Sequence, residues 1–224
     1  MNDGHVIPQL GCGMYMMNED EMSRLVPVAI ETGYRHFDTA NAYFNEVTLG
    51  RALAASGVPR ADLFITSKLF PQSYPAGQTG PDIDATLERL GTDYLDLLLL
   101  HQPYGAYVEA WPVLEGAVRA GKVRSIGLSN FPVRKIEEIM AVATIRLAVL
   151  QVELNPYWNQ HELRQELGRI GLGDVTLEGW YPFGHGDAEI MREPVLVEVA
   201  RAPGRTAAQV VLRYLMQLGD AALY

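Results

Sequence analysis

The stretch that decides the fold is Tyr34-Arg35-His36-Phe37-Asp38-Thr39-Ala40-Asn41-Ala42-Tyr43-Phe44-Asn45-Glu46. It predicts a short strand, Tyr34 to Phe37, which ends at the Asp38 carboxylate. A loop of small residues leads to Tyr43, and Asn45-Glu46 then begins a helix. A barrel of alternating strands and helices builds its active site from residues at the carboxyl ends of its strands and in the loops that follow. We therefore interpret Asp38 and Tyr43 as candidate functional residues.

Two later strands end in the same way. Phe64 to Ser67 leads into Lys68, and Leu97 to Leu100 leads into His101. A strand-end aspartate often only caps a helix, and a single tyrosine or histidine often only packs in the core. A lysine that closes an apolar strand needs a partner, because burying an unpaired charge costs several kcal/mol. Four such groups at one barrel face together indicate an active site.

Strands and helices alternate along the rest of the chain. Predicted strands recur about every 30 residues, which is the length of one strand–helix–strand unit. They end at Asp38, Lys68, His101, Ser129, Glu153 and Trp180. Helices are predicted over residues 18–33, 45–56, 81–90, 107–120, 132–142, 160–170 and 206–218. This alternation predicts parallel strands with crossover helices, and no linker divides the chain, so we expect residues 1–224 to form a single domain.

Composition excludes several classes of function. The 224 residues carry a net charge of −9, which argues against nucleic acid or an anionic membrane as a partner. The single cysteine, Cys12, rules out an intrachain disulfide and fits a reducing compartment. The N-terminus lacks a secretory signal pattern and no apolar run could span a bilayer, so the expected location is the cytoplasm.

Other motifs of cofactor and metal sites are incomplete. Gly11-Cys12-Gly13 lacks the third glycine of a dinucleotide-binding fingerprint. His161-Glu162 begins a helix without the second histidine of a zinc-protease helix, so no metal site is expected. Asn2 to His5 is interpreted as the turn of a short hairpin that plugs one end of the barrel.

Five motifs occur in an order that resembles the aldo-keto reductase family, in particular its bacterial 2,5-diketo-gluconate reductase-like members. They are Gly33 to Ala40 with Tyr43 and Asn45-Glu46, Thr66-Ser67-Lys68-Leu69, Leu99-Leu100-His101-Gln102-Pro103, Gly121 to Phe131, and Gln151 to Pro156. The resemblance covers essentially the whole chain. It implies an α/β fold of the (β/α)8 TIM barrel type.

The same resemblance implies that an aldehyde or ketone is reduced to an alcohol by hydride from NADPH, with NADH possible. Tyr43 would donate the proton to the carbonyl oxygen, and Lys68 would lower the pKa of its phenol toward working pH. Asp38 would hold Lys68, and His101 would donate a hydrogen bond to the substrate oxygen.

The resemblance also assigns binding residues. Those expected to hold the cofactor are Gly13, Met14, Ser129, Asn130, Gln151, Trp180, Tyr181, Pro182, Phe183 and Gly184. Met14 and Tyr181 depart from the pattern, because a hydroxyl residue is usual at both positions. Tyr15, Phe70 and Gln102 match the substrate pocket, and this lining suits a small carbonyl compound with an apolar part.

The end of the chain is the weak point of the barrel prediction. After Gly219 the chain offers only Asp220-Ala221-Ala222-Leu223-Tyr224, and acids and alanines are poor strand formers. We therefore expect the eighth strand and the C-terminal segment to be truncated or degenerate. The first and seventh strands would then expose unpaired edges, so we expect either a monomer of low stability or a dimer across the open barrel edge.

That weakness motivates an alternative function. A truncated or degenerate barrel with impaired cofactor binding would be a non-catalytic structural or interaction protein, or an engineered fragment. A barrel isomerase is a weaker alternative, because no other segment supplies a phosphate-binding loop.

Overall fold

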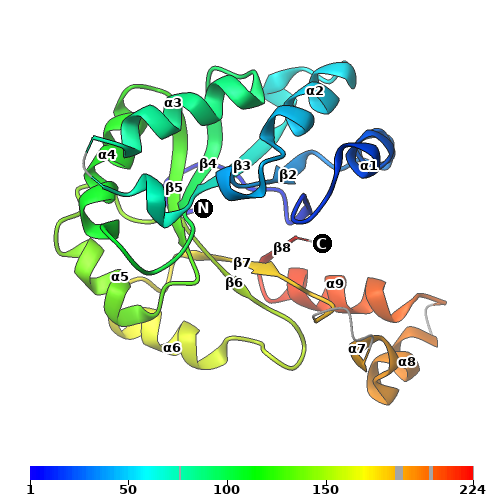
Figure 1. The fold of residues 1–224 in the computed structure, drawn as a ribbon. Helices are drawn as coiled ribbons and strands as arrows, with labels where there is room; N and C mark the ends of the chain where they lie inside the picture. The colour runs from blue at the N-terminus through cyan, green and yellow to red at the C-terminus, as the bar shows by residue number, and fades with distance from the viewer. Residues whose placement is uncertain (76, 185–188, 202–203, 224) are drawn as a thin grey trace.

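Eight parallel strands close into a barrel in the computed structural model, which describes residues 1–75, 77–184, 189–201 and 204–223. The strands follow one another around the barrel in sequence order, with helices outside them (Figure 1). The strands are β1 Leu10–Gly13, β2 His36–Asp38, β3 Phe64–Leu69, β4 Leu95–Leu100, β5 Val123–Ser129, β6 Val149–Glu153, β7 Thr176–Trp180 and β8 Ala221–Leu223. The predicted (β/α)8 barrel is confirmed.

The predicted helices are present with small changes at their ends. They are α1 Glu19–Glu31, α2 Glu46–Ala55, α3 Thr79–Leu90, α4 Tyr107–Arg119, α5 Val133–Met140, α6 His161–Arg169 and α9 Ala207–Gln217. Two further helices, α7 Glu189–Arg192 and α8 Pro194–Arg201, were not predicted. Among the described residues, no helix has the length and apolar character needed to cross a membrane.

Local sequence explains where the first and last long helices begin. Asn18 accepts from the Glu21 backbone amide, and the Glu21 side chain accepts from the Asn18 amide, which is a capping box. Thr206 and Gln209 form the same motif before α9. Pro27 lies inside α1.

The expectation for the eighth strand is wrong. Leu10 and Gly11 of β1 pair with Ala222 and Leu223, and β7 pairs with Ala221 and Ala222 on the other side. The neighbouring strands β1 and β7 therefore both pair with β8. This tertiary pairing outweighs the low strand propensity of alanine. With both edges paired, the reason for expecting a dimer across an open gap is removed.

Among the described residues, apolar side chains pack in three clusters. The larger cluster lies between strands and helices and includes Phe37, Trp111 and Leu128. A smaller cluster contains Phe64, Leu97, Leu99, Ala148 and Val149, and Met1 and Ile7 pack against it. The N-terminal segment therefore covers an apolar part of the barrel, although residues 1–9 form a turn and no hairpin strands.

Candidate active site

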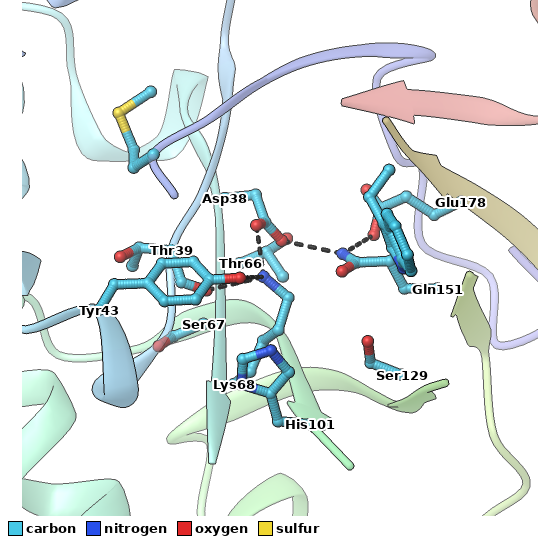
Figure 2. Close-up of polar contacts among 12 residues, drawn as sticks. Asp38, Thr39, Tyr43, Thr66, Ser67, Lys68, His101, Ser129, Gln151 and Glu178 are labelled. Carbon is cyan, nitrogen blue, oxygen red and sulfur yellow. Dashed lines mark hydrogen bonds and ion pairs between the residues drawn. The ribbon is translucent and has the colours of Figure 1, made fainter. Parts of the chain in front are cut away.

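The Lys68 ammonium is the centre of the site. Strand β2 pairs with β3 so that Asp38 lies opposite Thr66. Lys68 is two residues further along β3, so its side chain lies on the same face of the strand as that of Thr66. The Lys68 Nζ donates to the Asp38 carboxylate and, at 3.0 Å, to the Thr39 carbonyl oxygen. It lies 3.5 Å from the Tyr43 hydroxyl oxygen (Figure 2). Because Lys68 is fully buried, its charge acts through little intervening water.

The protonation of this trio follows from burial and charge. Burial raises the pKa of the Tyr43 phenol, and this effect outweighs the lowering by Lys68. The expected net lowering of the Tyr43 pKa is therefore not found, and Tyr43 keeps its proton at neutral pH. The Lys68 pKa is raised, because Asp38 and Tyr43 outweigh its loss of hydration. Burial raises the Asp38 pKa, while Lys68 and a hydrogen bond from Gln151 oppose that rise.

His101 lies beside the phenol as a neutral ring. Its imidazole contacts Tyr43 edge-on with centroids 5.6 Å apart, and Phe70 in the same way at 5.5 Å. Burial and the nearby Lys68 charge lower the His101 pKa to about 3. Its Nδ1 is buried and has no hydrogen-bond partner among the described residues. A neutral imidazole carries one N–H donor and one acceptor nitrogen, so the ring can form hydrogen bonds without adding a charge.

Gln151 connects this site to a second carboxyl group. Its amide nitrogen donates to Asp38 Oδ2 at 2.9 Å and to Glu178 Oε2 at 2.7 Å. Figure 2 shows the Gln151 amide between the two acidic side chains. Glu178 lies in β7, and His36 Nε2 is 3.5 Å from its other oxygen. Neither Glu178 nor His36 was identified from the sequence.

Ser129, Asn130 and Trp180 form a neighbouring group at the carboxyl ends of β5 and β7. The Asn130 amide donates to Ser129 Oγ at 3.2 Å and to the His101 carbonyl oxygen at 3.3 Å. Its oxygen accepts from the Trp180 indole nitrogen at 3.0 Å. Asn130 has φ = 65° and Tyr181 has φ = 50°, conformations that are uncommon for residues other than glycine and often occur at functional sites.

The remaining expected cofactor residues are spread along adjacent loops. Gly13 ends β1, and the Met14 side chain is fully buried in the larger hydrophobic cluster. The Met14 backbone amide donates to the Asp38 carbonyl oxygen at 2.9 Å. Tyr181 packs edge-on against Trp180, and Pro182 is buried. Phe183 packs beside the cluster that contains Leu154, Ile190, Val211, Leu215 and Ala222, and Gly184 follows it.

The expected substrate residues surround the phenol and the imidazole. Tyr15 lies 5.0 Å from Tyr43 between ring centroids and is 52% exposed. Phe70 contacts His101 and, at 6.3 Å, Tyr104. The Gln102 backbone is held by Tyr74, whose hydroxyl donates to its carbonyl and accepts from its amide. Exposed aromatic rings therefore flank the buried polar centre.

Glu178 was missed although the sequence carried a signal for it. An acid in the middle of a five-residue strand otherwise composed of Thr176, Leu177, Gly179 and Trp180 is unusual, because charged side chains are rarely fully buried. Alternation along β7 places Glu178 and Trp180 on the same face. His36 carried a weaker signal, since a histidine within a short strand often only packs.

Comparisons with known proteins agree with this arrangement. The family profile described as Aldo/keto reductase family matches residues 9–223. An aldo-keto reductase from Mycobacterium sp. (strain MCS) is 41% identical over 226 residues, covering 100% of this chain and 78% of that protein. Another from Mycolicibacterium smegmatis is 39% identical, covering 98% of this chain and 79% of that protein.

Solved structures show the same likeness. The aldo/keto reductase from Brucella melitensis superimposes with a TM-score of 0.91 at 36% identity, covering 99% of this chain and 85% of that chain. A putative 2,5-diketo-D-gluconic acid reductase B gives a TM-score of 0.90 at 38% identity, covering 97% of this chain and 77% of that chain. The expected resemblance is confirmed, and this chain belongs to the aldo/keto reductase family.

Proposed function

We propose that this protein reduces an aldehyde or ketone to an alcohol with NADPH, and that Tyr43 donates the proton. Membership of the family supports oxidoreduction of carbonyl compounds and the use of a nicotinamide cofactor in general. The observation that carries the proposal is the buried Lys68 ammonium, which contacts both the Asp38 carboxylate and the Tyr43 hydroxyl.

The proton step follows from the charges at this centre. Tyr43 is neutral at working pH, so its proton is available to a carbonyl oxygen placed within hydrogen-bond distance. When the proton leaves, the phenolate forms beside Lys68, and the ammonium stabilises that charge most strongly in the transition state. Asp38 holds the ammonium in place through the charged hydrogen bond.

His101 fits the role of orienting the substrate. Its ring lies beside both Tyr43 and the half-buried Phe70. As a neutral imidazole it donates one hydrogen bond without introducing a second cation, so it can orient the carbonyl oxygen toward the phenol.

The residues beside the centre fit a nicotinamide. Ser129, Asn130 and Gln151 offer hydroxyl and amide groups for its carboxamide, and the Trp180 indole, fixed by Asn130, offers an aromatic face. When bound there, the reduced cofactor supplies the hydride. Asn130 and Tyr181, with their left-handed backbones, shape this edge of the site.

The experiment is to follow loss of the NADPH absorbance with simple aldehydes. Tyr43→Phe removes the proton donor and is expected to lower kcat by about 10²- to 10⁴-fold. Tyr94→Phe is the matched control, because this phenol precedes β4 at the other end of the barrel, between Arg60 and Arg124. Equal rates in Tyr43→Phe and wild type would refute the assignment of the donor.

Cofactor binding is measured separately from turnover. NADPH and NADH are titrated against tryptophan fluorescence, with Asn130→Leu as a variant that releases the Trp180 indole. Quenching at lower NADPH than NADH, weakened in the variant, supports the proposal. No quenching at millimolar concentrations of either would favour a non-catalytic barrel.

A further inference from the structure

Glu178 is a fully buried acid that the reaction proposed above does not use. Its Oε2 accepts one hydrogen bond, from Gln151, at 2.7 Å. Its Oε1 is buried without a hydrogen-bond partner among the described residues. A carboxylate would demand more donors than this pocket supplies, whereas a protonated carboxyl group needs fewer.

The side chains that face Glu178 come from the strands packed around it. From β2 come Asp38 and His36, and from β3 comes Lys68, which acts on it at a distance. From β6 comes the uncharged Gln151, and residues 221–223 of β8 carry no titratable side chain. Cys12 of β1 packs in the larger hydrophobic cluster.

These neighbours favour the neutral acid. Burial and the nearby Asp38 charge raise the Glu178 pKa to about 8. His36 does not supply a compensating cation, because burial lowers its pKa to about 3. The contact of 3.5 Å between His36 Nε2 and Glu178 Oε1 therefore joins two neutral groups at neutral pH.

Gln151 connects Glu178 to Asp38 and Lys68 through hydrogen bonds. One of its amide hydrogens is held by Glu178 Oε2 and the other by Asp38 Oδ2. The Asp38 carboxylate uses its other oxygen to accept from Lys68. Four side chains from four strands thus form one chain of contacts that ends at Tyr43 (Figure 2).

We propose that Glu178 is a positioning residue for the reduction: as a neutral acid it anchors the Gln151 amide, which holds Asp38 on Lys68. Loss of its proton at alkaline pH adds a negative charge near Lys68 and disfavours the Tyr43 phenolate, so proton donation slows. This inference rests on the proposed function, which supplies the reaction that Glu178 tunes.

The kinetic test compares wild type with two variants of Glu178. Wild-type kcat/KM should fall about tenfold between pH 7 and pH 9, because one unit charge acts across a few ångströms of buried protein. Glu178→Gln keeps the acceptor for Gln151 but cannot ionise, and should lose this decline. Glu178→Met lacks the acceptor, and its kcat at pH 7 should lie about tenfold below that of Glu178→Gln.

Glu115→Gln is the matched control. Glu115 is also buried, but it accepts from the backbone of Thr144 and Ile145 on the outer layer of the barrel. It should keep the wild-type ratio of kcat/KM at pH 7 and pH 9. The same decline in Glu178→Gln and wild type would overturn the proposal.

A measurement that does not depend on catalysis tests the protonation of Glu178 separately from the proposed function. In protein labelled with carbon-13 at the glutamate carboxyl groups, one resonance should titrate near pH 8 and be absent in Glu178→Gln. Asp38→Asn removes a like charge and should lower that midpoint by about one pH unit or more. A Glu178 midpoint below pH 6, or no shift in Asp38→Asn, would overturn the inference. Absence of NADPH oxidation by wild type would instead overturn the proposed function, and the resonance would still decide the state of Glu178.

Discussion

The Lys68 ammonium lies 3.5 Å from the Tyr43 hydroxyl oxygen and donates a hydrogen bond to the Asp38 carboxylate. Both charged groups are buried, so each depends on the other for stability as well as for chemistry.

Lys68→Met should abolish measurable reduction and lower the free energy of unfolding by about 3 kcal/mol, because it leaves Asp38 buried and unpaired. Asp38→Asn in combination with Lys68→Met removes both charges. The double variant should recover much of the stability lost in Lys68→Met but none of the activity. Urea unfolding and NADPH oxidation measure the two effects, and additive losses of stability would contradict the ion pair.

Two buried histidines predict a loss of stability at acid pH. His36 and His101 have pKa values lowered to about 3 in the folded protein, against 6.5 for an exposed histidine. Below about pH 6.5 the unfolded chain binds protons that the folded protein does not, so stability falls as pH drops from 6.5 toward 3. His101→Phe should flatten part of this fall in urea unfolding. An unchanged pH dependence would show that His101 titrates normally.

We expect the ion pair between Arg164 and Asp220 to stabilise β8. Arg164 donates to Asp220 Oδ2 at 2.5 Å, just before the strand begins. Arg164→Met leaves the buried Asp220 carboxylate unpaired and should lower the free energy of unfolding by about 3 kcal/mol. Arg146→Met is the control, since its pair with Asp174 is exposed and should contribute about 1 kcal/mol or less. Equal losses in the two variants would contradict this role.

Two glycines should respond in opposite ways to alanine. A Cβ at Gly127 of β5 would lie 2.2 Å from the Val149 carbonyl oxygen, whereas at Gly116 of α4 it would meet nothing within 4 Å. Gly127→Ala must push β5 and β6 apart and should destabilise by at least about 2 kcal/mol. Gly116→Ala should stabilise by about 0.5–1 kcal/mol. Thermal unfolding distinguishes them.

Local patterns in the sequence were sufficient for most of the barrel. The runs Phe64 to Leu69 and Leu95 to Leu100 are apolar because parallel barrel strands are covered on both faces. The placement of Asp38, Lys68 and His101 at strand ends followed from the same pattern, since parallel strands deliver their carboxyl ends to one face. Tyr43 followed from the loop after the strand that ends at Asp38, whereas Asn130 was found through the family resemblance.

The sequence by itself therefore determined the alternation of strands and helices up to β7 and the four polar groups at the barrel mouth. Only the tertiary structure decided that Ala221–Leu223 forms a strand, because it pairs with β1 and β7, which are distant from it in the sequence. It alone also decided the protonation of Tyr43 and Glu178. Burial and neighbouring charges set a pKa, and both depend on side chains that meet only after the barrel has closed.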